Sequence, residues 1–102
     1  MVEVVVSVKG SAREIVKKIA KIDSLHRGTF DGLVYRGVSL DINGSIVDYL
    51  PFTVKFMGDD KRIVIKVAEQ TAIHKLRPSK NGIDFIVKYF TDLIKGIDGD
   101  GM

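Results

Sequence analysis

An apolar stripe near the end of the chain constrains the fold more than any other sequence feature. Between Ile83 and Ile97 the large apolar residues recur at steps of three and four, the spacing of a helix with one buried side. The stripe consists of Ile83, Ile86, Val87, Phe90, Leu93, Ile94 and Ile97. Asn81 is placed to cap this helix, and Gly96 is placed to end it. Most of the preceding chain has strand patterns, so we expect the helix to pack on a sheet.

Length and composition favour one domain. The chain has 102 residues, which we divide into a single domain over residues 1–97 and a flexible tail over residues 98–102. There is no cysteine, which excludes disulfides and thiolate metal sites. No segment has the length of a membrane span or the pattern of a signal peptide, so we predict a cytoplasmic location.

The first part of the chain predicts a strand followed by a helix. Valines alternate with other residues from Val2 to Lys9, which is typical of a strand with one dry side. Ser11 and Glu14 then form a capping box at the start of a helix. The apolar face of this helix contains Ala12, Ile15, Val16, Ile19 and Ile22. Residues 24–31 are expected to form a polar connection, with room for a short helical turn.

A hairpin is predicted around Asn43-Gly44, a dipeptide typical of two-residue hairpin loops. With these two residues as the loop, the positions of opposed residues sum to 87, so Leu40 lies opposite Val47. The more apolar face then contains Val38, Leu40, Ile42, Val47 and Tyr49. The other face carries Ser39, Asp41 and Asp48, and we expect the two aspartates to be close together and solvated.

The apolar phase of the next strand changes at Pro51, from odd to even positions, so we predict a bulge or bend at Leu50-Pro51. The following strand, residues 62–68, alternates cleanly. A four-residue loop between the two strands would place Phe56 opposite Ile63 and Val54 opposite Ile65. Residues 71–77 fit either a fifth strand or a continuation of the fourth, and we favour the fifth strand.

These elements predict an α+β protein in which a curved antiparallel sheet packs on a long C-terminal helix, in the order β-α-β3/4-α. The strand Val4-Val5-Val6-Ser7-Val8, the helix start Ser11-Ala12-Arg13-Glu14 and the C-terminal stripe together resemble the helix-grip fold of the START and Bet v 1-like superfamily. The chain is shorter than usual members of that superfamily. The TATA-binding-protein-like half-domain has a similar element order, so fold alone selects no function.

No catalytic or metal-binding residues are predicted. His26 and His74 are candidate bases, but neither has a catalytic neighbour at a readable spacing. Asp41 and Asp48 could act as paired carboxylates, although their position beside a turn favours a solvated surface role. No glycine-rich phosphate loop follows a strand. The sequence indicates no cofactor and does not define an oligomeric state.

Aromatic residues of the sheet and the last helix fit either a filled core or a pocket between helix and sheet. The helix-grip resemblance favours a pocket for a small apolar ligand in a non-enzymatic binding protein. Its expected lining is Arg36, Tyr49, Phe52, Val54, Phe56, Ile65, Ile86, Tyr89 and Phe90.

The helix-grip resemblance also implies an enzyme of the cyclase or hydrolase kind, which is the least favoured interpretation. The main alternative function is a nucleic-acid-binding or protein-interaction module. Basic residues fall into two groups, Lys17, Lys18 and Lys21 in the first helix and Lys75, Arg77 and Lys80 before the last. Acidic residues interrupt both groups, and the net charge is only +3, so nucleic acid is the less favoured partner.

Overall fold

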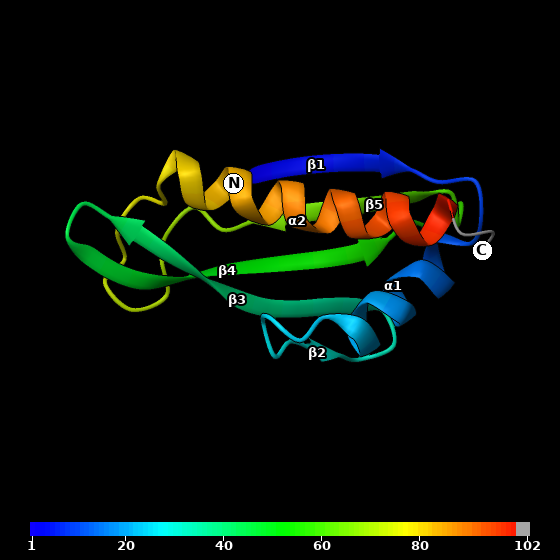
Figure 1. Ribbon diagram of the computed structural model, residues 1–102, viewed down its shortest axis with the longest axis horizontal. Helices are drawn as coiled ribbons and strands as arrows, with labels where there is room; N and C mark the ends of the chain where they lie inside the picture. Colours follow the sequence, from blue (N-terminus) through cyan, green and yellow to red (C-terminus); the bar gives the residue numbers. More distant parts are fainter. Residues whose placement is uncertain (100–102) are drawn as a thin grey trace.

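The computed structural model describes residues 1–99 and has an α+β fold. Its elements are β1 (Val2–Ser7), α1 (Ala12–Ile22), β2 (Thr29–Phe30), β3 (Val34–Asn43), β4 (Ile46–Phe56), β5 (Arg62–Val67) and α2 (Lys80–Gly99). The strands form one antiparallel sheet in the order β1-β5-β4-β3-β2. Figure 1 shows α2 lying along the sheet, with the β3–β4 hairpin extending beyond it at one end of the molecule. The expected sheet with a long C-terminal helix packed on it is confirmed.

Both helices contribute to one core. From α1 the core receives Ala12, Ile15, Val16 and Ile19, and from α2 it receives Ile86, Phe90, Ile94 and Ile97. The sheet contributes Val6, Tyr35, Leu50, Phe52, Val54, Ile63, Ile65 and Val67. Ile22, expected on the buried face of α1, is instead exposed at the end of that helix. One of the two hydrogen bonds of the predicted capping box is confirmed: the Glu14 amide donates to Ser11 Oγ at 3.3 Å.

The hairpin between β4 and β5 has the predicted register. Phe56 lies opposite Ile63, and Val54 lies opposite Ile65. The register between β3 and β4 differs from the prediction, because Leu40 lies opposite Tyr49 and opposed positions sum to 89. The loop is therefore Gly44-Ser45. Gly44 has φ of 67°, whereas Asn43 and Ser45 are not among the residues with positive φ. Glycine at the first loop position fits a type II′ turn rather than the type I′ turn typical of Asn-Gly.

Of the bulge or bend predicted at Leu50-Pro51, the bulge is wrong, because β3 and β4 pair from Val34 to Asn43 without an inserted residue. The change of phase has another cause. Leu50 shares the inner face with Phe52, whereas Tyr49 points to the outer face. The strand thus keeps its alternation, and the apolar residues that it exposes, including Val47 and Tyr49, precede Pro51.

In the distal half of the hairpin, residues 38–49, the buried and exposed faces are the reverse of those expected. Leu40 is 57% exposed, whereas its neighbour Asp41 is 1% exposed. The exposed apolar side chains there are Val38, Leu40, Ile42, Ile46, Val47 and Tyr49. Ser39 and Asp48 are buried with Asp41. The predicted solvated aspartate pair is therefore wrong.

The segment after β5 accounts for this exchange. It forms no strand, contrary to the prediction for residues 71–77. It folds instead beside β4, where the Ala72 amide donates to the Tyr49 carbonyl at 2.6 Å. It also contacts the hairpin's inner face, where the Ile73 and His74 amides donate to the buried Asp48. Backbone N–H groups of this loop need acceptors, and buried carboxylates supply them. Polar residues of the hairpin consequently face inward.

The boundaries of α2 also differ from the prediction. Ser79 caps the helix instead of Asn81, because Ser79 Oγ accepts a hydrogen bond from the Gly82 amide at 3.0 Å. The helix does not end at Gly96 but continues to Gly99. Asp98 Oδ2 and Oδ1 accept from the Lys9 and Gly10 amides, both at 2.9 Å, so the predicted flexible tail begins too early. Residues 100–102 of that tail lie outside the described residues.

The connection between α1 and β3 contains no helical turn within residues 24–31, and its last part is a strand that the sequence did not indicate. This strand, β2, pairs only Thr29 with Arg36 and Phe30 with Tyr35. Among residues 1–99, no strand consequently neighbours the outer edge of β3 from Gly37 onward. This open edge borders the site described next.

Candidate functional site

Most of the expected pocket residues belong to the hydrophobic core. Phe52, Val54, Ile65, Ile86 and Phe90 are at most 2% exposed and belong to one buried cluster. The rings of Phe52 and Phe90 are 4.8 Å apart between centroids. Phe56 is partly buried and packs against the same cluster. The structure therefore brings these six residues together as packing partners.

The remaining three expected residues lie elsewhere. Arg36 is exposed and forms an ion pair with Asp31 at 3.2 Å. Tyr49 is exposed on the outer face of the hairpin. Tyr89 is partly buried at the edge of the core, and its hydroxyl donates to Asp23 at 2.8 Å. Of the nine residues, only Tyr49 also lines the apolar hollow described next.

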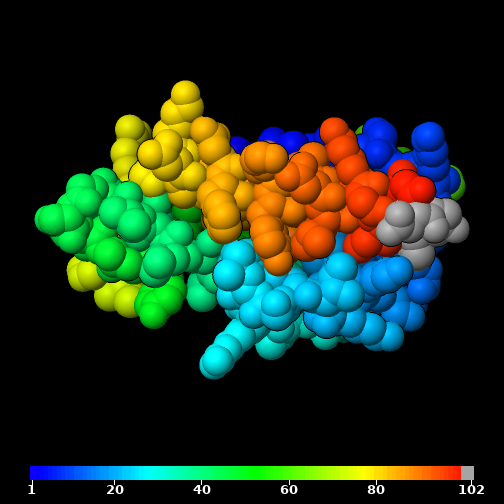
Figure 2. All heavy atoms as spheres, in the orientation of Figure 1, coloured from blue at the N-terminus to red at the C-terminus, as the bar shows by residue number. Residues whose placement is uncertain are grey.

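An open hollow of about 620 Å³ lies beside the free edge of β3. Its walls come from the segment after α1, from β3 and β4 and from the first turns of α2. We call it the surface hollow; it is lined by Leu25, His26, Arg27, Val38, Ser39, Leu40, Tyr49 and Phe85. Figure 2 views the molecule on the side where these segments meet. Apolar walls with a few polar groups are typical of small-ligand sites.

Asp23 organises the polar side of this region from the C-terminal end of α1. Its carboxylate accepts hydrogen bonds from Tyr35 Oη at 2.6 Å, Tyr89 Oη at 2.8 Å, the Leu25 amide at 3.0 Å and His26 Nδ1 at 3.1 Å. Burial opposes ionisation of Asp23, but these four hydrogen bonds outweigh it and hold the pKa of the carboxyl below its ordinary value. Asp23 is therefore a buried carboxylate anion at neutral pH.

The two tyrosines respond in the opposite direction. Burial, followed by the hydrogen bond to Asp23 and the negative charge of Asp23, raises the pKa of Tyr89 to about 12. The same causes raise the pKa of Tyr35 further. Both hydroxyls consequently remain protonated donors, which keeps Asp23 fixed in position.

His26 lies between Asp23 and Ser39. Its ring contacts Phe52, Tyr89 and Phe90 at centroid distances of 4.9, 5.1 and 5.4 Å. Its Nδ1 is 3.1 Å from Asp23 Oδ2, and its Nε2 is 3.2 Å from Ser39 Oγ. Because ionised Asp23 can only accept hydrogen bonds, His26 Nδ1 carries a proton. In the neutral imidazole, Nε2 then accepts a hydrogen bond from the Ser39 hydroxyl.

A second aspartate–histidine pair lies on the distal half of the hairpin. Asp48 Oδ2 accepts from His74 Nδ1 at 2.8 Å, and also from the His74 amide and Thr71 Oγ1. The Ile73 and Tyr49 amides donate to Asp48 Oδ1. Burial again opposes ionisation, but the hydrogen bonds, led by that of the His74 amide, hold the Asp48 pKa well below its ordinary value. The His74 side chain is half exposed.

Asp41 completes the polar inner face of the hairpin. It accepts from both the Ser79 hydroxyl and, at 3.0 Å, the Ser79 amide. Asp41 and Asp48 are opposed on neighbouring strands, as their predicted proximity requires. Each carboxylate accepts hydrogen bonds from a different part of the loop before α2. The two aspartates therefore hold this loop against the hairpin and do not form an acid–base pair.

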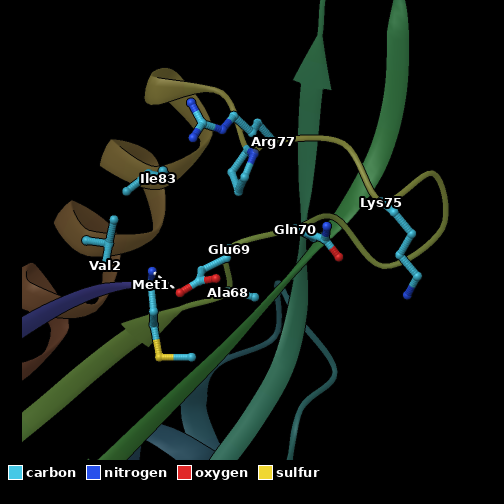
Figure 3. Close-up of a pocket in the computed structure, with 9 residues that line it drawn as sticks. Met1, Val2, Ala68, Glu69, Gln70, Lys75, Arg77 and Ile83 are labelled. Atoms are coloured by element: carbon cyan, nitrogen blue, oxygen red, sulfur yellow. Dashed lines mark hydrogen bonds and ion pairs between the residues drawn. The ribbon is translucent and has the colours of Figure 1, made fainter.

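Figure 3 shows another hollow, of about 440 Å³, between the N-terminal end of β1 and the chain that follows β5. Glu69 Oε1 accepts from the Met1 amino group there at 2.8 Å. The Lys75 side chain points away from this pair in the figure. Charged groups of both signs line this hollow, so it is a weaker candidate for an apolar ligand.

The two basic groups of the sequence do not form one surface. Lys17, Lys18 and Lys21 lie on α1, whereas residues 75–80 lie at the other end of the long axis (Figure 1). Within residues 1–99, no three histidine, aspartate or glutamate side chains come together to hold a metal ion. Neither helix of this described region has the length and apolar character needed to cross a membrane.

Sequence reasoning missed the Asp23–His26–Ser39 cluster. The three-residue spacing of Asp23 and His26 was the available signal for their contact. Ser39 could not be found in this way, because it comes from a strand whose inner face was assigned wrongly.

Comparison of the chain with models of known protein families, with curated proteins and with solved structures gives no match. Function is therefore argued from the site itself.

Proposed function

We propose that the protein binds a small apolar molecule in the surface hollow. The observation that carries the proposal is the hollow's composition: Leu25, Leu40, Tyr49 and Phe85 are each about half exposed around the polar His26 and Ser39. Its volume of about 620 Å³ lies in the usual range for small-ligand sites, roughly 300–1,000 Å³. Covering the apolar walls would stabilise the complex by about 25 cal/mol per Å² removed from water.

The proposal moves the ligand away from the space between sheet and helix. Phe52 and Phe90 pack closely in that space, so the apolar area still open to a ligand lies at the edge of β3. The same proposal includes a helix-grip relationship, supported by the single antiparallel sheet with α2 lying along it. It also includes a cytoplasmic location, for which a soluble apolar ligand carrier is suited.

Thermal unfolding tests the binding proposal, because a ligand of the folded state raises the melting temperature as it saturates its site. Medium-chain fatty acids, isoprenoid alcohols and small aromatic compounds are the probes. At least one class should produce a saturable rise. Short single-stranded and duplex DNA should produce none at physiological salt.

Two matched variants locate the effect. Leu40→Asp places a charge in the wall of the surface hollow, whereas Ile42→Asp places one two residues along on the same exposed face and outside the hollow. Leu40→Asp should remove the ligand-induced rise, and Ile42→Asp should keep it. Equal responses of the two variants, or a rise with DNA alone, would contradict the proposal.

A further inference from the structure

Ser39, His26 and Asp23 form a continuous chain of hydrogen bonds that ends in the surface hollow. Ser39 Oγ is 3.2 Å from His26 Nε2, and His26 Nδ1 is 3.1 Å from Asp23 Oδ2. Ser39 comes from β3, and the other two come from the end of α1 and the segment after it. Ser39 and His26 both line the hollow, whereas Asp23 lies behind them. A serine, a base and a carboxylate in this order form the constellation of nucleophilic acyl transfer.

The proton positions favour reactivity at Ser39. Asp23 already accepts from two tyrosine hydroxyls and a backbone amide, which fixes it as an anion beside His26. In its neutral form, His26 with the proton on Nδ1 presents an unprotonated Nε2 to the Ser39 hydroxyl. The enclosing rings of Phe52, Tyr89 and Phe90 limit rotation of the imidazole. A base held in this way is preorganised to take the hydroxyl proton.

Backbone donors lie next to Ser39. The Tyr49 and Pro51 carbonyls accept from the Ala72 and Ala68 amides, on the side of β4 away from β3. In an antiparallel pair, two directly opposed residues either hydrogen-bond to each other or both direct their backbone N–H and C=O groups away from each other. Tyr49 and Pro51 direct theirs away from β3, so the residues opposite them direct theirs away from β4. These opposed residues are Leu40 and Val38, whose N–H groups consequently face the open edge on either side of Ser39. Because they lie two residues apart on a strand, one of them at a time can donate to a carbonyl oxygen of a molecule in the hollow.

We propose that Ser39 is a nucleophile that accepts the acyl group of an ester of an apolar carboxylic acid. This inference rests on the proposed binding of an apolar molecule in the surface hollow. Ser39 Oγ bonds to the ester carbonyl carbon while its proton passes to His26 Nε2. The bond from that carbon to the alcohol oxygen breaks, and the alcohol leaves with the proton from His26. Water then attacks the acyl-serine, gives a proton to His26 and releases the acid, and His26 returns the proton to Ser39.

His26 and Ser39 are the catalytic residues of this scheme, and Asp23 is a positioning residue. The Asp48–His74 pair provides an internal contrast. It has the same carboxylate-to-Nδ1 contact, but no hydrogen bond joins His74 to a serine within residues 1–99. Reactivity towards acylating reagents is therefore expected at Ser39 alone.

An alkyl fluorophosphonate, which phosphonylates activated serines with loss of fluoride, is the first probe. Intact-mass measurement should show one adduct on the full chain, and peptide mapping should place it on Ser39. Ser39→Ala should abolish the adduct, and Ser45→Ala in the exposed hairpin loop should retain it. Circular dichroism and melting temperature establish that Ser39→Ala is folded. Absence of an adduct on the parent protein, or an adduct unaffected by Ser39→Ala, would overturn the proposal.

A cysteine variant provides a second test, because the chain has no native cysteine. A thiol beside His26 should be alkylated by iodoacetamide at least tenfold faster in Ser39→Cys than in Ser45→Cys, although the latter is the more exposed site. A slower reaction of Ser39→Cys would show that burial dominates and would count against an activated position.

Ligand binding is measured in parallel with a fatty alcohol, which has no acyl group to transfer. If the alcohol raises the melting temperature of both the parent protein and Ser39→Ala but no serine is labelled, the nucleophile is overturned and the proposed binding function stands. If neither thermal shift nor labelling occurs, both fail. A thermal shift together with labelling lost in Ser39→Ala supports both.

Discussion

The two halves of the β3–β4 hairpin place opposite kinds of side chain inside the protein. Near the helices the inner face carries Tyr35, Phe52 and Val54, which pack in the core. In the distal half the same face carries Asp41 and Asp48, while the outer face is apolar. Both halves belong to one uninterrupted ladder with one register. What differs is the covering element: apolar helices over the first half and a loop rich in backbone donors over the second.

The difference shows that alternation identifies two faces of a strand without stating which is buried. Buried polar groups are tolerated where hydrogen bonds satisfy them. Asp48 meets that condition through five hydrogen bonds. The apolar outer residues are then left for the solvent or a ligand, and this places the surface hollow at the distal half.

The largest expected effect comes from comparing two leucines on opposite faces of the hairpin, Leu50 and Leu40. Leu50→Ala removes a fully buried side chain and should lower the free energy of unfolding by about 2–5 kcal/mol. Leu40→Ala removes an exposed one and should change it by less than about 0.5 kcal/mol. Urea unfolding measures both. A greater loss for Leu40→Ala would restore the face assignment that the sequence suggested and contradict the structure.

A smaller effect is expected from acid, through Asp48. Its pKa is lowered in the folded protein, so it contributes stability above the unfolded pKa of about 4, and this contribution is lost as the pH falls towards the folded pKa. The difference in urea midpoint between the parent protein and Asp48→Asn should therefore be large at about pH 7 and smaller at about pH 2.

Asp84→Asn is the matched control for this titration, because Asp84 lies exposed on α2. It should differ little from the parent protein at either pH. A midpoint difference for Asp48→Asn that stays constant across the range would show that Asp48 does not hold the loop as an anion.

The smallest effect is expected at the hairpin loop. Gly44 has φ of 67°, which side chains with a Cβ adopt at a cost, although no atom within 4 Å would contact an added Cβ. Gly44→Val should lower stability by about 1 kcal/mol through backbone strain alone. Asn43→Ala should cost less from the turn itself, since Asn43 has no positive φ. Asn43→Ala also removes the hydrogen bond that Asn43 Nδ2 donates to the Arg77 carbonyl at 2.7 Å. Only a loss well above the ~1 kcal/mol typical of one hydrogen bond would favour a type I′ loop with the predicted register.

Local patterns predicted the parts of the fold in which neighbouring residues determine the outcome. The β4–β5 register followed from two alternating strands joined by a polar turn. The Ser11 cap and the buried faces of both helices followed from periodicity. In these segments the covering layer was apolar, so the usual assignment of apolar residues to the interior was correct.

The rest depended on contacts between distant segments. Asp41 forms hydrogen bonds with Ser79, which is 38 residues away in the sequence, and His26 contacts Ser39, which is 13 residues away. No periodicity encodes such pairs. The contact between Phe52 and Phe90 was expected from their positions, but how closely they pack depends on side-chain volumes that a pattern does not measure.

Methyl-resolved NMR tests the central claim, that a ligand binds beside the free edge of β3 rather than within the core. The protein would be labelled at isoleucine, leucine and valine methyl groups and titrated with a medium-chain fatty acid. The account predicts saturable shifts of Leu25, Val38 and Leu40, while Ile65 and Ile86 remain unchanged. Shifts that begin at Ile65 and Ile86 and spare Leu40 would place the ligand between sheet and helix, and would contradict this account.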